Sequence, residues 1–442
     1  MCVDMWRTPM PVSEAVALFE DVANQPPSRF LTPDTSYFRP FYQLSIGAIW
    51  RSDASVDAKL SAVKLMQIVP FALLVLLLIA HCRPLTAVDA AATTVAVAVL
   101  LGSPGLRDNI EIPLSYTIVG MPLALMAWML LTMERRVWHG AALILLTVIA
   151  VGFKEQGLIL VALVTIAWMM RAPGASRWTV LALVVLVAAY VAYRLNWREK
   201  WPMFEQALGL GFIEMEPSEA EKRYGAFPYW MYLYSSVSTI LNILFSEPTR
   251  GTFRIIRDIR NGHPQLWELN HLVSAVALSG IIFWWGTGTV KGAIREGWSA
   301  ESRVFVAMIV VVLSCGVLSF NYSRDRLGGM AAPFYALAAF YAIRAAAARA
   351  GSASRPVLIG LALMLVAGMW QVRAISTMEY VRLTSLRNQQ GWLVELERRR
   401  LEFAERDTYL RIMESTLEQG IAPDAPRPTR YPRPIPEILA LP

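Results

Sequence analysis

The chain has 442 residues, of which 55% are hydrophobic and 17% are charged, and its mean hydropathy is +0.42. Soluble domains carry about 25% charged residues, so this composition excludes a string of soluble domains and predicts an all-α, polytopic transmembrane helical bundle. The net charge of +7 is spread over loops and tail, which favours contact with membrane lipid and argues against nucleic acid as a partner. The three cysteines show no metal or redox spacing.

Three regions are expected along the chain. Residues 1–63 precede the first long apolar run and contain an amphipathic helix, VSEAVALFEDVA, capped by Ser13, whose acidic residues form its solvated face. Residues 64–376 hold the apolar runs and form the transmembrane domain. Residues 377–442 form a polar tail. The first and third regions are predicted to lie on the extracytoplasmic side of the membrane, because of the loop charges described below.

Runs of about 20 apolar residues predict membrane helices, and the second region has room for ten or eleven. The clearest runs are 64–82, 112–133, 176–194, 268–288, 303–321, 328–346 and 356–374, and the weaker ones are 87–103, 139–152 and 155–171. Segment 226–247 is apolar but rich in Tyr, Trp and Phe, which are typical of membrane interfaces. We therefore expect an interfacial or re-entrant helix there. Ten crossings then remain, which places both ends of the chain on the same side.

A polar island, Lys154-Glu155-Gln156-Gly157, interrupts two apolar runs, AALILLTVIAVG before it and LILVALVTIAWMM after it. Ionisable residues at membrane depth are costly, rare and usually functional. The two adjacent opposite charges can offset part of each other's desolvation. The alternative interpretation is a short turn outside the membrane with a solvated ion pair.

The tail has two parts. Residues 377–419 have the pattern of a long amphipathic helix, and residues 421–442 contain seven prolines and are expected to be extended. We favour an appendage that lies at the membrane interface. The alternative is a lid over a site on the outer face or a docking arm.

The short loops differ in charge. One set holds eleven basic residues: Arg83, Arg135, Arg136, Arg171, Arg177, Lys291, Arg295, Arg303, Arg344, Arg349 and Arg355. The other set holds four: Arg107, Lys154, Arg324 and Arg326. The positive-inside rule places the first set in the cytoplasm. We therefore expect a multi-pass protein of the inner membrane whose two termini are both extracytoplasmic.

On the predicted outer side, nearly every short turn pairs a base with an acid. The groups are Arg107/Asp108/Glu111, Lys154/Glu155 and Arg324/Asp325/Arg326. Cations that converge at one membrane interface suit a polyanionic ligand such as a lipid phosphate or diphosphate. The alternative is a set of arginines that reach the interface and form local salt bridges.

Four short motifs, in order along the chain, resemble elements of one family. The run Tyr37 to Leu44 (YFRPFYQL) resembles the Y-R-P-L element that closes the first outer loop of GT-C membrane glycosyltransferases, and Pro104 to Glu111 resembles their second outer loop. Phe153 to Gly157 (FKEQG) resembles the K-E-x-G element of the third outer loop, and Arg324 to Leu327 (RDRL) resembles a late R-Y/R-L element. The similarity spans residues 30–345 and is greatest to eukaryotic transmembrane O-mannosyltransferases with TPR tails and their bacterial relatives.

The resemblance implies a GT-C-like fold and an enzyme that moves a sugar from a polyprenyl-phosphate donor to a glycan, lipid or protein acceptor on the outer face. It implies that a carboxylate of the first outer loop is the general base and that basic residues hold the leaving phosphate, often with a divalent metal such as Mg²⁺ or Mn²⁺. The substrate-binding residues that it implies are Tyr37, Arg39, Glu111, Lys154, Glu155, Arg324 and Arg326. Of these, Lys154 and Arg324 or Arg326 bind phosphate, whereas Arg39 and Glu155 orient the first loop.

The amino-terminal end departs from this pattern. Family members begin with a membrane helix that is followed directly by an acidic pair, whereas this sequence starts inside the expected first outer loop. We therefore expect a truncated copy or one that has lost that helix. Asp4 is the acid nearest to the position of the catalytic base, and the true base belongs upstream of Met1 if the chain is truncated.

A non-catalytic polytopic protein, either a scaffold or a transporter, is the alternative function. A transporter is expected to show repeats, or helices broken by Gly or Pro at matching positions in two halves. The sequence has no such symmetry, and its polar islands lie at helix ends. A scaffold remains the stronger form of this alternative.

Overall fold

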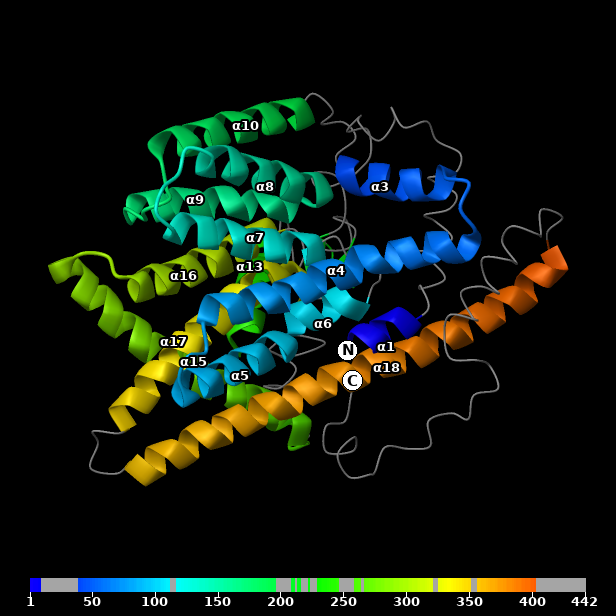
Figure 1. The fold of residues 1–442 in the computed structure, drawn as a ribbon. Helices are drawn as coiled ribbons and strands as arrows, with labels where there is room; N and C mark the ends of the chain where they lie inside the picture. The colour runs from blue at the N-terminus through cyan, green and yellow to red at the C-terminus, as the bar shows by residue number, and fades with distance from the viewer. Residues whose placement is uncertain are drawn as a thin grey trace.

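A computed structural model describes residues 1–8, 39–111, 117–195, 208–210, 213–215, 222, 229–245, 258–263, 266–320, 325–350 and 356–402. The described chain is helical apart from one short antiparallel hairpin of β1 (Leu208–Leu210) and β2 (Ile213–Met215), in which Gly209 pairs with Glu214. The all-α polytopic bundle expected from the sequence is thereby confirmed (Figure 1).

The helices follow one another along the described part of the chain. In the amino-terminal half they are α1 (Cys2–Arg7), α3 (Pro40–Arg51), α4 (Val56–Cys82), α5 (Ala87–Leu101), α6 (Pro104–Glu111), α7 (Thr117–Thr132), α8 (His139–Phe153), the 3₁₀ helix η2 (Glu155–Leu158), α9 (Ile159–Met169) and α10 (Arg177–Leu195). In the carboxy-terminal half they are α13 (Tyr229–Phe245), α15 (Leu266–Glu296), α16 (Ala300–Leu318), the 3₁₀ helix η4 (Asp325–Ala331), α17 (Ala332–Ala350) and α18 (Pro356–Glu402).

Apolar helices make this chain an integral membrane protein. In its described part, five helical segments are long and apolar enough to cross a membrane, namely α4, α15, α16, η4 with α17, and α18. Six shorter apolar helices accompany them: α5, α7, α8, η2 with α9, α10 and α13. This set agrees in number with the ten or eleven membrane helices expected. Three of the short helices, α5, α8 and η2 with α9, coincide with the weak apolar runs at 87–103, 139–152 and 155–171, whereas α7 and α10 fall in the runs 112–133 and 176–194, which are among the clearest.

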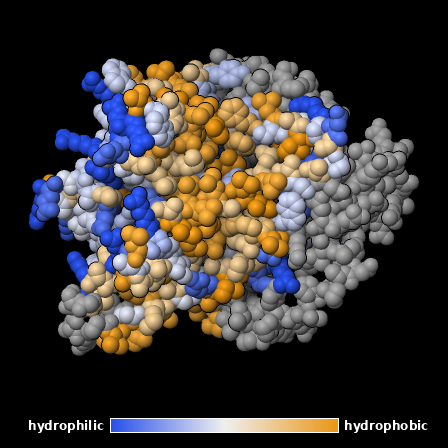
Figure 2. Space-filling model, viewed as in Figure 1, coloured by the Kyte–Doolittle hydropathy of each residue, from blue (hydrophilic) through white to orange (hydrophobic). Residues whose placement is uncertain are grey.

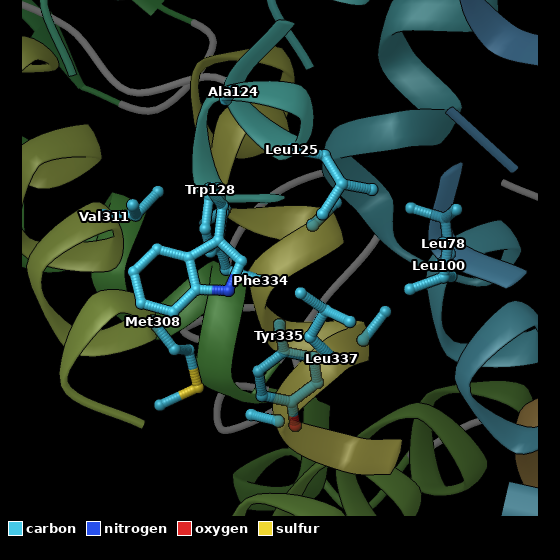
Figure 3. Close-up of a cluster of buried hydrophobic side chains, with 14 of the residues drawn as sticks. Leu78, Leu100, Ala124, Leu125, Trp128, Met308, Val311, Phe334, Tyr335 and Leu337 are labelled. Carbon is cyan, nitrogen blue, oxygen red and sulfur yellow. The ribbon is translucent and has the colours of Figure 1, made fainter. Parts of the chain in front are cut away.

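The core of the bundle lies around α17. In its apolar window 72% of the residues are buried, against 33% for both α4 and α18, so α17 is central and the other two face outward. Its many alanines allow neighbouring helices to approach closely. Trp128 of α7 meets Phe334 of α17 edge-on, with ring centroids 6.2 Å apart, and Figure 3 shows Met308 of α16 beside them.

Basic loops gather at one end of the bundle, which we call the basic end. Arg303 at the start of α16 donates from Nε to the carbonyl of Met170, after α9, at 3.2 Å. The Arg344 Nε of α17 lies 3.6 Å from a carboxylate oxygen of Asp89, which is part of the capping box that starts α5. Figure 2 shows an apolar band across the middle of the described surface and hydrophilic residues concentrated along the left edge, where these loops lie.

The opposite end, which we call the Lys154 end, holds the junctions α5–α6, α8–α9 and α16–η4. Helix α13 enters the bundle from this end. Its Tyr232 ring lies 5.5 Å from the ring of Phe320, just after α16, whereas the carbonyl of Leu244 accepts a hydrogen bond of 2.6 Å from Ser279. Ser279 lies 13 residues into α15, or about 20 Å along its axis. Helix α13 thus reaches into the bundle from the Lys154 end, and α15 begins at that same end. The described part of 226–247 is compatible with the re-entrant interpretation.

Helix α18 is one continuous helix of 47 residues, about 70 Å long, which runs the length of the molecule (Figure 1). It passes without interruption through residue 376, where the sequence suggested a boundary. The amphipathic segment expected from residue 377 is therefore an extension of the last membrane helix up to Glu402. Its continuation to residue 419 and the proline-rich segment 421–442 lie outside the described residues.

Candidate functional site

The polar island forms a tight turn between α8 and α9. The backbone N–H of Lys154 donates to Ala150 at 2.9 Å and closes α8, and the N–H of Gly157 donates back to the Lys154 carbonyl at 2.8 Å. A Cβ atom on Gly157 would lie 2.3 Å from the backbone carbon of Ala150. Only glycine fits there, because the turn packs directly on the α8 backbone. The lysine side chain is only 8% exposed.

Gln156 fixes this turn to two other elements. Its side-chain oxygen accepts a hydrogen bond of 2.9 Å from the hydroxyl of Thr117 at the start of α7. Its side-chain nitrogen donates to the carbonyl of Leu327 in η4, also at 2.9 Å. A buried amide with both ends bonded in this way holds three segments in one register. Gln156 had no expected role, although its place in the polar island was a usable signal.

Arg39 joins the amino-terminal motif to the same turn. The Arg39 Nε atom lies 3.6 Å from a carboxylate oxygen of Glu155, and the two side chains are 14% and 26% exposed. Pro40 starts α3, and Phe41 packs so closely on α8 that a Cβ atom on Gly152 would lie 2.2 Å from the Phe41 ring. The sequence also allowed Glu155 to pair with its neighbour Lys154. In the structure, the ion pair of Glu155 is formed with Arg39.

Helix α6 brings the second motif to η4. A Cβ atom on Gly105 would lie 2.9 Å from the backbone of Gly328 and Gly329, so the two backbones are in direct contact. Glu111 is the last residue of α6, and Arg326 lies in η4, directly before Leu327. Tyr37 and Arg324 lie outside the described residues. The described parts of all four motifs therefore meet at the Lys154 end.

Two further buried guanidinium groups lie at this end. Arg107 of α6 is 7% exposed and stacks on the Tyr380 ring of α18, 4.7 Å from its centroid. Arg373 of α18 is 1% exposed, stacks on Trp370 at 3.8 Å and donates to the carbonyl of Gly102 at 3.2 Å. Arg373 also donates to the carbonyl of His271 and the hydroxyl of Ser274, both on α15. These contacts tie α18 to the α5–α6 junction.

Asp4 lies in a different part of the molecule from the polar island. Its carboxylate oxygen is 3.0 Å from the amino group of Met1. Helix α1 packs against α4 and α18, and the carbonyl of Trp6 accepts a hydrogen bond of 2.6 Å from Lys64. The Asp4 carboxylate is thus paired with the amino group of Met1, and its charge acts on Glu379 of α18, whereas Arg39 and Glu155 meet beside α8.

The described residues do not supply a metal-binding set, because no three His, Cys, Asp or Glu side chains gather among them. They do enclose one small cavity of about 20 Å³ between α6, α13, η4, α17 and α18, lined by Ser103, Thr239, Asn242, Tyr335 and Trp370 among others. That space has room for about one water molecule and is too small for a sugar ring.

The arrangement places cationic side chains and a buried amide where several helices end, which suits an anionic group at the membrane interface. The carboxylate of Glu155 forms an ion pair with Arg39 and so positions the amino-terminal motif. No family model matches the chain, and the comparisons with curated proteins and with solved structures found no match.

Proposed function

We propose that the protein is a membrane glycosyltransferase of GT-C type that moves a sugar from a polyprenyl-phosphate donor to an acceptor at the Lys154 end of the bundle. The observation that carries the proposal is the convergence of the four motifs, through the Arg39–Glu155 ion pair, the Gln156–Leu327 hydrogen bond and the contact of Gly105 with Gly328. Motifs that are far apart in the sequence thereby share one site.

The chemistry follows from the charges. When the glycosidic bond breaks, the leaving phosphate gains negative charge, and cations held in place beforehand stabilise that state without reorganising. Lys154 is buried at the turn, and Arg326 precedes the residue that Gln156 holds. We assign phosphate binding to Lys154 and Arg326, with Arg324 as the further candidate. Arg39 and Glu155 are positioning residues.

The acceptor, a glycan, lipid or protein hydroxyl, must lose its proton to a base within hydrogen-bond reach. The resemblance puts this base in the amino-terminal segment, so Glu155, which positions Arg39, is not our choice. Asp4 is the candidate from that segment, and to act as the base its carboxylate must leave the amino group of Met1, 3.0 Å away. An Asp4→Asn variant that transfers sugar at the wild-type rate would remove it from the mechanism.

The proposed orientation has the Lys154 end outside the inner membrane. Position 390 on α18 and position 348 at the end of α17 are exposed and lie toward opposite ends of the bundle. In a Cys2→Ser background, a membrane-impermeant maleimide is expected to label Gln390→Cys in intact cells and to leave Ala348→Cys unlabelled. Lysed cells provide the control for reactivity. The reverse pattern would place the basic end outside and contradict the positive-inside assignment.

Donor cleavage tests the function itself. The full chain is reconstituted in lipid nanodiscs with a panel of polyprenyl-phosphate-linked hexoses, and release of the polyprenyl phosphate is measured. Arg39→Met is expected to lower the rate about tenfold, the factor that corresponds to 1.4 kcal/mol, because Glu155 loses its partner. Arg51→Met, at the other end of α3 and exposed, is the matched control. A wild-type chain that cleaves no donor of the panel would favour the scaffold.

A further inference from the structure

Two loops at the basic end are joined into one surface. The backbone N–H of Gly174, between α9 and α10, donates to the carbonyl of Leu131 in α7 at 3.0 Å. Helices α8 and α10 begin side by side, because a Cβ atom on Gly140 would lie 2.9 Å from the hydroxyl oxygen of Thr179. The α7–α8 and α9–α10 loops therefore lie together, where Figure 1 shows these four helices close to one another at their left ends.

This surface is strongly cationic. Its exposed side chains include Arg135 and Arg136 before α8, Arg171 after α9 and Arg177 at the start of α10, whereas Glu134 is the one acid of the two loops. Within the described residues, none of these four arginines forms an ion pair. A guanidinium group presents a planar fork of N–H donors that matches the oxygens of a phosphate. Four such groups on two joined loops therefore suit an anionic phosphate group.

Arg171 occupies a backbone position that favours glycine. Its φ is 52°, in the left-handed region. The N–H of Ala172 donates to the carbonyl of Ala167 and the N–H of Arg171 donates to that of Trp168, both at 2.9 Å, which is the Schellman pattern of a helix end. Glycine adopts this conformation without steric cost. The chain thus has a cationic side chain at a position where glycine would be less strained.

A buried imidazole follows the arginines of the first loop. His139, the first residue of α8, is 1% exposed, and neither ring nitrogen has a hydrogen-bond partner among the described residues. Buried polar atoms are rarely left unpaired, and the exceptions indicate strain, catalysis or a further bound group. The half-exposed Trp138 ring packs edge-on against the imidazole, with centroids 4.5 Å apart. Helix α8 also lacks a side-chain cap, and the N–H groups at a helix start attract anions.

Apolar side chains extend from the same two loops. Val137 is fully exposed, and Trp138 and Trp178 are 50% and 63% exposed. Tryptophans beside arginines are typical of the membrane interface, where the apolar part enters the lipid and the guanidinium stays among the headgroups. This arrangement favours a lipid headgroup, and not a phosphate dissolved in water, as the source of the anion.

We propose that the loops at residues 133–138 and 170–177 bind the phosphate headgroup of an anionic phospholipid over the start of α8. The site does not depend on the proposed sugar transfer, because α8, about 22 Å long, separates it from the Lys154 turn. The two loops supply the arginines jointly, so a lipid bound there holds the starts of α8 and α10 together.

Lipid titration of the full chain in detergent, followed by native mass spectrometry, tests the site. The wild type is expected to bind phosphatidylglycerol more tightly than phosphatidylcholine, which is neutral, by about thirtyfold or more. Arg135→Gln with Arg136→Gln should lower the affinity for phosphatidylglycerol about thirtyfold, at about fivefold for each arginine. Equal affinity of the wild type for the two lipids would overturn the proposal.

A second pair of variants is the matched control. Lys291→Gln with Arg295→Gln removes the same charge at the same end of the bundle from exposed positions at the end of α15. This pair should leave the affinity for phosphatidylglycerol nearly unchanged. An equal loss in both pairs would show attraction to the net charge of the whole end and would overturn the site.

Arg171→Gly separates binding from folding. It removes one charge and relieves the backbone, so resistance to denaturant should be unchanged or higher while the affinity for phosphatidylglycerol falls about fivefold. His139→Phe keeps a buried aromatic ring without the two nitrogens and should also lower that affinity. Wild-type affinity in both variants would overturn the proposal. Excess inorganic phosphate should not displace the lipid, and displacement would assign the site to a soluble phosphate instead.

Discussion

Gly157→Ala is expected to destabilise the protein by about 3 kcal/mol, the upper end of the usual cost of overpacking. The added Cβ would lie 2.3 Å from both the backbone carbon of Ala150 and the backbone nitrogen of Val151. Backbone atoms of a helix cannot rotate away as a side chain does, so α8 and the turn must separate. Unfolding in a denaturant titration of the detergent-solubilised protein measures the loss.

Gly280→Ala is the control for this prediction. Gly280 lies inside α15, and a Cβ there would meet nothing within 4 Å. Since alanine favours a helix over glycine by about 0.8–1.0 kcal/mol, this change should leave stability unchanged or raise it. If the two variants lost the same stability, the close packing of the turn on α8 would be wrong. Loss of the turn should also release the Gln156–Leu327 hydrogen bond, and with it η4.

Lys154→Ala is expected to lower donor cleavage by about 10²–10³, the equivalent of roughly 3–4 kcal/mol of transition-state stabilisation. A lysine that holds a leaving phosphate contributes most when the bond is breaking, so the rate should fall more than the stability. The rate of cleavage by the full chain in nanodiscs is compared with its resistance to denaturant. Lys154→Arg keeps the charge and should recover part of the rate.

A structural role for Lys154 would give another pattern. If its ammonium served only to balance a buried charge, its removal would cost about 3–5 kcal/mol of stability, and Lys154→Arg would restore stability and rate together. Lys291→Ala, exposed near the basic end of α15, controls for loss of net charge. Full cleavage by Lys154→Ala would exclude a catalytic role for the island and leave it as a turn.

Hydropathy predicted the framework well because each membrane helix is encoded locally. The run 64–82 ends at Cys82, as α4 does, and the break at Lys154 separates α8 from α9. Hydropathy could not show where the last helix ends, because the polar tail continues the membrane span as one helix. Residues 356–402 form one helix because no proline or glycine cap ends the pattern at 376, and a change in polarity alone does not end a helix.

The pairings within the site could not be predicted, because they join residues far apart in the chain. Gln156 and Leu327 are 171 residues apart, and the sequence offers no pattern that relates them. Glu155 had an adjacent cation in Lys154, yet its ion pair is with Arg39, since α3 is held on α8 by Phe41. Arg373 was overlooked because it falls within the last apolar run, where a single charge barely alters the mean hydropathy.

Because α18 is one continuous helix, the part of the tail up to Glu402 has a fixed rotational orientation about the helix axis. From Arg373, which is fixed by its contacts with α5 and α15, to Glu402 the chain is one helix, so residue 402 lies about 43 Å away in a direction set by 100° per residue. Removing a whole number of helical turns would shorten the helix and leave the direction in which its remaining side chains point unchanged. Removing two residues would rotate the rest of the helix, up to Glu402, by about 200° about its axis, so the orientation of this segment depends on the exact length of the helix as well as on its attachment to the bundle.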